Sequence, residues 1–328
     1  MGFNESQATN IYPFGKVITT PQDSYADFCS AYQKRELEQN FIMQLNHLIK
    51  DVQLHRGISM RLLAGNKSFE KDFKTLQSKI NRRLSTLLVF STYDKTLFSI
   101  ADKKNIQLSW DTIRNDWQDD KLTDNFELHS HFIEQLLLKI LDISNNLRKP
   151  LLDELQKSAD SESSGDTDRI GSEDNERYPR QIKQMELLNF ICSLLPISIE
   201  NMAKIRGLAS FAAEIGCVHE SQQRKLRYLL QCAREDNVKA GHCSQRLHSL
   251  LGDAFNAKSI VGEFETKFVY FIELVSRDVL SGSKIQTSSW QIFNLGTNII
   301  DKYWQIVDEG LNLLRIWQRD DFNAWVNS

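Results

Sequence analysis

The apolar residues of this chain recur at intervals of three and four positions, the spacing of amphipathic helices. In the first half, one such stripe contains Phe41, Leu45, Leu48 and Val52 and continues through His55, Ser59 and Leu62. Two further stripes follow residues 69–87 and 132–143, and a middle helix is expected around 108–117. This spacing places the side chains on one helix face, which must be covered. The first half therefore predicts about four helices, and a four-helix bundle would close them.

The second half repeats this pattern. Its apolar stripes occupy residues 188–213, with an expected kink at Pro196, and then 226–230, 247–251, 264–274 and 290–314. No segment shows the strict alternation of apolar and polar positions that is typical of a half-buried strand. The pattern predicts an all-α fold of two four-helix bundles.

Proline placement and one acidic segment predict where the two halves are separated. No proline occurs between residues 24 and 149 or between 197 and 328. The segment SADSESSGDTDRIGSEDNERYPR between the halves has many carboxylates and a single aliphatic residue, Ile170, so we interpret it as a flexible linker. The predicted parts are an N-terminal extension 1–23, a first bundle 24–157, an acidic linker 158–181, a second bundle 182–316 and a C-terminal tail 317–328.

Composition and charge exclude several classes of protein. The 328 residues are 41% hydrophobic, enough for about two globular units with real cores. With 40 basic and 43 acidic side chains, the chain has no overall basic field, so direct nucleic-acid binding is not expected. Five cysteines without a CxxC pair favour reduced thiols and a cytoplasmic location. No window approaches the roughly 18 uncharged apolar residues of a membrane helix, so no membrane contact is expected.

Two helical stripes contain the same interruption, an arginine followed by a glycine. Arg56 and Gly57 occur in LHRGISMRLLAGN, and Arg206 and Gly207 occur in KIRGLASFAAEIG, 150 positions later. A glycine inside a helix costs about 0.5–1 kcal/mol relative to alanine, and a buried guanidinium without an anion costs several kcal/mol more. The equivalent positions suggest that the two bundles are related by an internal repeat.

Two arginines at one helix interface are suited to a small anion. The planar guanidinium fork binds planar oxyanions, carboxylates or phosphate, and the glycines allow helices or a ligand to approach closely. The alternative is that each arginine pairs with a structural Glu or Asp of a neighbouring helix or extends toward solvent. A core carboxylate within 4 Å of each arginine would favour this alternative.

Five segments resemble the NIT family, the nitrate- and nitrite-sensing domain of bacterial receptors and antiterminators. They are HRGISMRLLAG, FEKDFKTLQSKINRRLSTL, FELHSHFIEQLLLKILDIS, IRGLASFAAEIG and SSWQIFNLGTNIIDKYWQIVDEGLNLL, which together extend over most of residues 30–316. The resemblance implies two four-helix bundles with nitrate or nitrite held between them by buried arginines. The ligand-binding residues it points to are Arg56 and Arg206, with Gly57 and Gly207 allowing close approach.

Weaker candidates and the expected mode of action complete this hypothesis. Ser59, Ser210 and Thr297 are possible hydrogen-bonding groups, and a further basic ligand is sought among Arg246, Lys267 and Arg277. Family members carry an RNA-binding module or transmembrane helices, which this sequence does not show. We therefore expect a cytoplasmic sensor that acts through a separate regulatory protein on nitrate-responsive gene expression or signalling, with a homodimer as one assembly.

Other functions have less support in the sequence. The histidines of HSH at 129–131 point to different faces of a helix, and no other metal-ligand spacing occurs, so neither a metal nor a cofactor is expected. No phosphate-binding loop or catalytic signature is present, which argues against an enzyme. The main alternative is a helical protein–protein interaction scaffold whose anion pocket is vestigial.

Overall fold

The chain is all-α, as the hydrophobic pattern predicts. The computed structural model describes residues 21–92, 97–115, 117–148, 179–282 and 284–326, and these contain helices and connecting turns without any strand. The acidic segment predicted as a linker lies almost entirely outside the described residues, as does most of the N-terminal extension. The α-helices are α1 (Pro21–Leu63), α2 (Glu70–Phe90), α3 (Ile100–Arg114), α4 (Leu122–Leu147), α6 (Arg180–Asn189), α7 (Leu195–Ile215), α8 (Glu220–Leu251), α9 (Ala257–Leu274) and α10 (Ser289–Val326).

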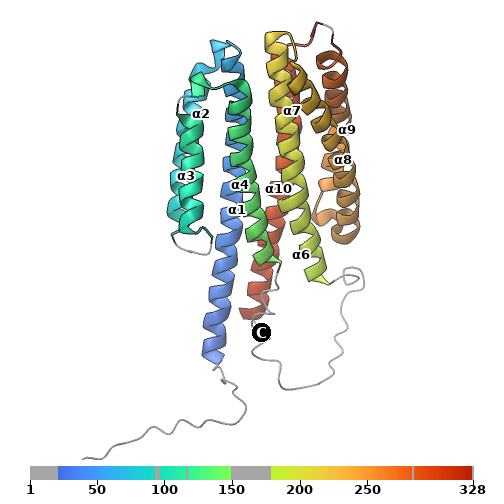
Figure 1. The fold of residues 1–328 in the computed structure, drawn as a ribbon. Helices are drawn as coiled ribbons and strands as arrows, with labels where there is room; N and C mark the ends of the chain where they lie inside the picture. The colour runs from blue at the N-terminus through green and yellow to red at the C-terminus, as the bar shows by residue number, and fades with distance from the viewer. Residues whose placement is uncertain (1–20, 93–96, 116, 149–178, 283, 327–328) are drawn as a thin grey trace, which may run out of the picture.

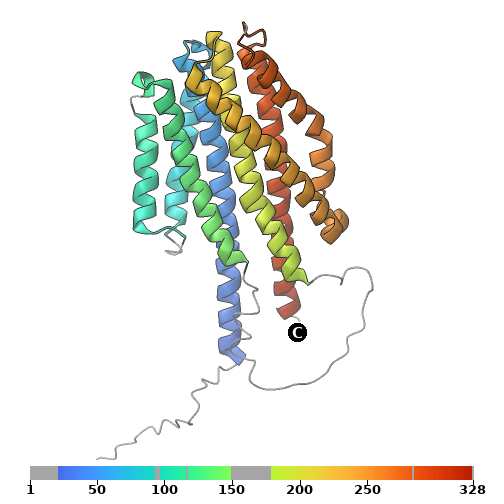
Figure 2. The same cartoon turned by 45° about the vertical axis from the view of Figure 1, so that its right-hand side comes forward.

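The helices of each half form a group, and the two groups lie side by side (Figure 1). In the first group, α1 packs against α2 and α4, and α3 packs against α4. In the second group, α10 packs against α7 and α9, and α8 also packs against α7 and α9. The groups meet mainly where α1 contacts α7 and α10, as the turned view also shows (Figure 2). An internal repeat relating the two groups stays a prediction.

One continuous core extends through both groups. Leu45 and Val52 of α1 belong to the same cluster of buried side chains as Ile199 of α7 and Ile300 of α10. Because the helices facing one another across the interface are apolar there, the two halves share a core, and any polar group in it must find its partners inside the protein.

The predicted kink at Pro196 is preceded by a local change of helix type. Residues Phe190–Leu194 form a π-helical turn between α6 and α7, and Pro196 occupies the first turn of α7. Proline has no N–H and its ring clashes with the carbonyl four residues earlier, so the wider turn accommodates it without ending the helix. The sequence from Arg180 to Ile215 thus forms one long helical stretch.

This stretch changes the expectation that no segment is apolar enough to resemble a membrane helix. Arg180–Ile215 is the one candidate among the described residues that is long and apolar enough to cross a membrane by length and composition, and 50% of its most apolar window is buried. It includes α7, which packs against α1, α8 and α10, so contacts on several sides account for its composition.

Three predicted boundaries are displaced in the structure. Helix α1 begins at Pro21, α6 begins at Arg180, and α10 continues to Val326, so residues 317–326 form helix rather than a separate tail. At the ends of α1 and α10 the reason is packing, because the rings of Phe28 and Tyr32 contact Phe322 with centroids 5.8 and 4.5 Å apart.

The middle helix of the first half also begins earlier than predicted. Helix α3 begins at Ile100, eight residues before the predicted start, and a capping box of Ser99 and Asp102 precedes it.

Candidate functional site

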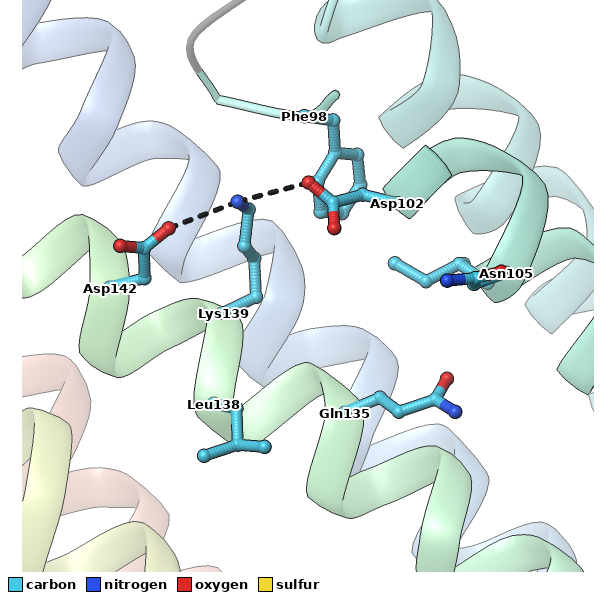
Figure 3. Close-up of a pocket in the computed structure, with 8 residues that line it drawn as sticks. Phe98, Asp102, Asn105, Gln135, Leu138, Lys139 and Asp142 are labelled. Atoms are coloured by element: carbon cyan, nitrogen blue, oxygen red, sulfur yellow. Dashed lines mark hydrogen bonds and ion pairs between the residues drawn. The ribbon is translucent and has the colours of Figure 1, made fainter. Parts of the chain in front are cut away.

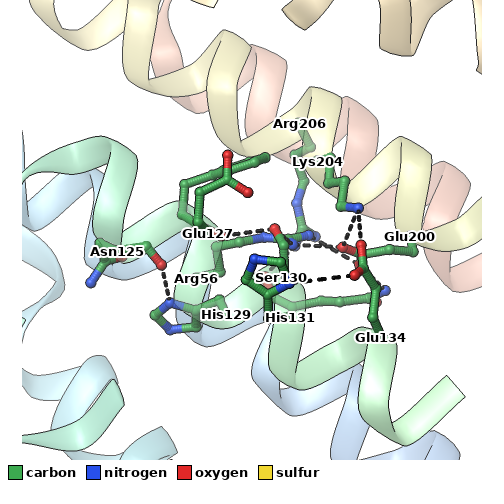
Figure 4. Close-up of polar contacts among 12 residues, drawn as sticks. Arg56, Asn125, Glu127, His129, Ser130, His131, Glu134, Glu200, Lys204 and Arg206 are labelled. Atoms are coloured by element: carbon green, nitrogen blue, oxygen red, sulfur yellow. Dashed lines mark hydrogen bonds and ion pairs between the residues drawn. The ribbon is translucent and has the colours of Figure 1, made fainter. Parts of the chain in front are cut away.

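Arg56 and Arg206 come together where α1 packs against α7, deep in the protein. Their relative exposures are 0% and 2%. Figure 4 shows the two guanidinium groups converging near the carboxylate of Glu200, which belongs to α7. The sequence prediction that two buried arginines meet at one helix interface is therefore confirmed by the geometry. Its interpretation as a ligand site stays a prediction.

Arg56 already has an anionic partner. Its Nη1 donates to Oε1 of Glu200 at 2.6 Å, and its Nη2 donates to Oε2 at 3.1 Å, which is a two-pronged ion pair. Nη1 also donates to the hydroxyl of Ser130 on α4 at 3.0 Å. The carboxylate thus occupies the face of the guanidinium at which a planar oxyanion would bind.

Glu200 receives hydrogen bonds from two residues of α1 and has an ion-pair contact within its own helix. Besides both terminal nitrogens of Arg56, its Oε2 accepts from Nε2 of Gln53 at 2.9 Å. Nζ of Lys204, one turn further along α7, lies 3.7 Å from Oε1 and also 3.2 Å from a carboxylate oxygen of Glu134 on α4. The carboxylate is therefore held by α1 and by its own helix, and Lys204 connects it to the surface of α4.

Arg206 has polar partners but no carboxylate. Its Nη1 donates to the hydroxyl of Thr297 at 2.9 Å, and its Nη2 donates to the backbone carbonyl of Gln53 at 3.0 Å. Its guanidinium carbon lies 4.7 Å from the ring centre of Phe293. Among the described residues it forms no ion pair within 4 Å. The pKa of Arg206 is lowered to about 10, because burial and the positive charge of Arg56 lower it more than the negative charges of Asp301 and Glu200 raise it.

The buried groups therefore carry an uneven charge. Two guanidinium groups, Arg56 and Arg206, face a single fully buried carboxylate, Glu200, which leaves an excess of one positive charge. Asp301 does not neutralise it, because this residue pairs with Lys50 at 2.8 Å near the surface. Unpaired charge in a protein interior is unfavourable by several kcal/mol, and within the described residues Arg206 is compensated only by the hydroxyl of Thr297 and the carbonyl of Gln53.

The two glycines that follow the arginines allow α1, α7 and α10 to approach closely. A Cβ atom at Gly57 would lie 2.7 Å from Cε2 of Phe293 and 3.7 Å from Nη2 of Arg206, and one at Gly207 would lie 3.2 Å from the sulfur of Met60. The close approach predicted for these glycines is confirmed. Gly296 of α10 has the same role without having been predicted, because a Cβ there would lie 3.0 Å from Cβ and Cγ of Arg206.

The weaker candidates fall into two groups. Thr297 accepts a hydrogen bond from Arg206, and the single hydroxyl proton of Ser59 lies between two acceptors, the backbone carbonyl of Arg56 at 3.0 Å and Oδ1 of Asn125 at 2.7 Å. Among the described residues, the buried hydroxyl of Ser210 has no hydrogen-bond partner. By contrast, Lys267 is exposed on α9, so its proposed role at the site is wrong for this geometry. Arg246 and Arg277 are likewise surface residues, paired with Glu186 and Glu273.

A third buried arginine, Arg61, lies about one turn further along α1 than Arg56. The guanidinium of Arg61 stacks on Phe69 at 3.9 Å and lies 5.3 Å from the ring of Phe293, which therefore contacts both Arg61 and Arg206. Nε of Arg61 lies 3.7 Å from a carboxylate oxygen of Glu214. Burial lowers the pKa of Arg61, and the charge of Glu214 opposes this. Because Arg61 has its own carboxylate, it adds no uncompensated charge to the site.

Two buried histidines flank the arginine cluster on the side of the first helix group. Nδ1 of His55 lies 2.7 Å from Nε2 of His129, and Nδ1 of His129 lies 2.7 Å from the carbonyl oxygen of Asn125. Because a carbonyl only accepts, His129 carries its proton on Nδ1 and accepts from His55. Burial holds the pKa of His55 well below its usual value, and the adjacent His129 acts in the same direction. The pKa of His129 is lowered to about 3, chiefly by burial and also by the charge of Arg56, against the hydrogen bond with the carbonyl of Asn125. Both rings are therefore neutral at pH 7.

The described residues include no group of side chains suited to holding a metal ion. Within the described part of the chain, no three His, Cys, Asp or Glu side chains are grouped so that they could hold a metal ion. Surface cavities are present elsewhere, including one of about 330 Å³ between α3 and α4, in which Lys139 bridges Asp102 and Asp142 (Figure 3). This cavity contains none of the predicted site residues.

Several groups at the site were not predicted from the sequence, Glu200 above all. Gln53, Ser130 and Lys204 were also missed, although each contacts Glu200 or Arg56. One local signal pointed to Glu200: it is the only acidic residue between positions 187 and 213, a strongly apolar stretch. A lone carboxylate in such a helix is expected to have a cationic partner.

Comparisons with known proteins give no relative for this chain. No protein-family model matches it, no curated protein matches it, and no solved structure matches it.

Proposed function

We propose that the chain is a sensor for a small planar oxyanion, nitrate or nitrite, which binds at Arg56 and Arg206. The observation that supports the proposal is the excess of one positive charge among Arg56, Arg206 and Glu200 in the core. A monovalent anion would bring the charge of this cluster to zero. The resemblance of the two arginine-glycine segments to nitrate-sensing domains suggests which anion this is.

The position of the cluster suggests how binding is reported. Arg56 is on α1, Arg206 is on α7, and the partner of Arg206, Thr297, is on α10. An anion that contacts both arginines would favour arrangements in which these helices approach one another, and a ligand shifts a conformational equilibrium by its difference in affinity for the two states. We expect the output to pass to a separate cytoplasmic regulatory protein that controls nitrate-responsive gene expression or signalling.

The experiment is thermal unfolding of the full chain with sodium nitrate, sodium nitrite, sodium chloride and sodium sulfate at matched ionic strength. An anion at 100 times its dissociation constant stabilises the folded state by about 2.7 kcal/mol. We expect a selective rise in melting temperature with nitrate or nitrite, and its loss in Arg56→Ala and Arg206→Ala. The matched control is Arg246→Ala, which removes a surface arginine. Equal melting temperatures in all four salts would contradict the proposal.

A second candidate function, a helical interaction scaffold, is favoured by the ion pair of Arg56. Because Glu200 already binds both terminal nitrogens of this guanidinium, the contact resembles an ordinary structural ion pair, although Arg206 lacks such a carboxylate among the described residues. A scaffold needs an exposed surface, and Leu108 and Leu138 of the neighbouring helices α3 and α4 are 53% and 66% exposed. This function predicts no response to nitrate and a stable protein complex that Leu138→Glu disrupts.

A further inference from the structure

We infer that the carboxylate of Glu200 occupies the place of the oxyanion in the ligand-free protein and competes with it. This inference rests on the proposed function, because it assigns the regulation and the ligand class of the same site. Glu200 would then be a specificity-determining residue, in addition to the two arginines that hold the charge.

The donors around Glu200 form a receptor for a flat O–X–O unit. Two parallel N–H groups come from Nη1 and Nη2 of Arg56, at 2.6 and 3.1 Å, and a third comes from the amide of Gln53, at 2.9 Å. Nζ of Lys204 lies 3.7 Å away on the side of Oε1. These donors point toward two coplanar oxygens, which is the geometry that a bidentate guanidinium binds.

This geometry selects a class of ligand. Nitrate, nitrite and formate all present two oxygens on one central atom in a plane, as the carboxylate of Glu200 does. Sulfate and phosphate are tetrahedral and carry more charge at neutral pH, and chloride has a single acceptor atom. The receptor therefore favours monovalent planar oxyanions, and an anion that replaced the carboxylate would leave its hydrogen bonds formed.

The displaced carboxylate would keep a cationic partner. Lys204 lies four residues after Glu200 on the same helix and already bridges it to Glu134 of α4 (Figure 4). The side chain of Lys204 is 15% exposed, whereas Arg56 is completely buried. A small shift of Glu200 toward Lys204 would keep its negative charge beside the cluster, while the incoming anion takes its position at Arg56 and adds the second negative charge that the two arginines lack.

Competition of this kind has a measurable consequence. As long as Glu200 is present, the apparent affinity for an anion is reduced by the free energy needed to displace the carboxylate. Removing the carboxylate while keeping the donors should therefore raise the affinity. A variant with a short apolar side chain should also accept formate in the position of the missing carboxylate.

The test compares the full-length parent with Glu200→Ala and Glu200→Gln. Dissociation constants for sodium nitrate and sodium formate are measured by calorimetric titration, with thermal unfolding in the same salts and with sodium sulfate as the control anion. We expect both anions to bind at least about tenfold more tightly to Glu200→Ala than to the parent, and this gain to be lost in Arg56→Met/Glu200→Ala. The matched control is Glu214→Gln, which removes the carboxylate beside Arg61 at the same helix interface. Circular dichroism checks folding, and Glu200→Gln replaces Glu200→Ala if the latter is unfolded.

The outcomes separate the inference from the proposed function. Equal nitrate affinity in the parent and in the Glu200 variants would overturn the inference and leave the sensor function intact. Binding to the Glu200 variants with no response of the parent would support the inference and overturn the sensor function. Failure of nitrate and formate to bind any folded Glu200 variant would overturn the inference, and so would an equal gain in Glu214→Gln.

Discussion

Arg56 of α1 and Glu200 of α7, 144 residues apart in the chain, form a buried ion pair with 2.6 Å between Nη1 and Oε1. Arg206 lies six residues after Glu200 on α7 and carries the charge that this pair leaves uncompensated. A stabilising ion pair and an uncompensated positive charge thus lie next to each other in the same core. The stability of the protein and its ligand binding are expected to depend on the same side chains.

The first prediction concerns the coupling between Arg56 and Glu200. Arg56→Met and Glu200→Met should each destabilise the protein by about 3–5 kcal/mol, because each leaves a buried charge without its partner. The double variant should be clearly more stable than the sum of the two losses predicts, because no unpaired member of this pair remains. Urea unfolding of the four proteins measures this coupling.

A surface pair serves as the control for that cycle. Lys50 and Asp301 lie 2.8 Å apart, and their side chains are 47% and 48% exposed. A coupling of no more than about 1 kcal/mol is expected for such a pair. If the Arg56 and Glu200 cycle were as weakly coupled as this one, the ion pair would not hold α1 against α7.

The second prediction is a loss of stability in mild acid caused by His55 and His129. Both histidines have a lower pKa in the folded protein than the usual 6.5, so below pH 6.5 the unfolded chain binds more protons than the folded one. Their contribution is fully present above pH 6.5 and is lost progressively as the pH falls toward about 3, the folded pKa of His129. The slope is about 1.4 kcal/mol per pH unit for each histidine.

Urea unfolding between pH 7 and pH 5 measures this slope. His129→Gln should make the slope shallower, because one buried imidazole that resists protonation is removed. The control is His131→Gln, since the side chain of His131 is 70% exposed and pairs with Glu134 at the surface. An unchanged slope in His129→Gln would show that other groups cause the acid sensitivity.

Much of the fold could be predicted because helical register is a local property. Leu45, Leu48 and Val52 are buried as their spacing indicates, and the later stripes also lie on buried helix faces. The early start of α3 was missed even though its signal is local, since Ser99 and Asp102 form a capping box. The extension of α10 past residue 316 depends on contacts with the distant start of α1, which spacing within one helix does not report.

The site was predictable only in part, for a related reason. A charged residue at an apolar position of a helical stripe is visible in the sequence, so Arg56 and Arg206 could be identified, together with the glycines beside them that allow the helices to approach closely. Which carboxylate pairs with which guanidinium depends on how α1 and α7 are aligned, and this alignment is set by tertiary packing. Glu200 therefore pairs with Arg56 and leaves Arg206 without a carboxylate, an asymmetry that the similar segments around the two arginines do not show.

The third prediction tests the close approach of α1 and α10. Gly57→Ala should destabilise the protein by about 1–3 kcal/mol, because the new methyl group would lie 2.7 Å from a ring carbon of Phe293. Phe293→Leu should recover part of this loss in the double variant, as it makes room for the methyl group. Gly262→Ala, on the exposed face of α9 with open space around it, should instead stabilise by about 0.5–1 kcal/mol. Thermal unfolding compares the variants, and equal effects at both glycines would contradict the packing argument.

The last prediction uses the unequal surroundings of the two arginines. Arg206→Met removes a buried charge that has no carboxylate within 4 Å among the described residues, whereas Arg56→Met leaves Glu200 without its guanidinium partner. Arg206→Met should therefore destabilise the protein by at least about 2 kcal/mol less than Arg56→Met does, because removing one member of a buried pair costs about 3–5 kcal/mol. Urea unfolding without nitrate measures the difference. Both variants should lose the response to nitrate, so Arg206→Met should lose this response with a much smaller loss of stability than Arg56→Met. Equal destabilisation by the two substitutions would show that Arg206 is compensated as fully as Arg56, and the electrostatic reason for anion binding would then be lost.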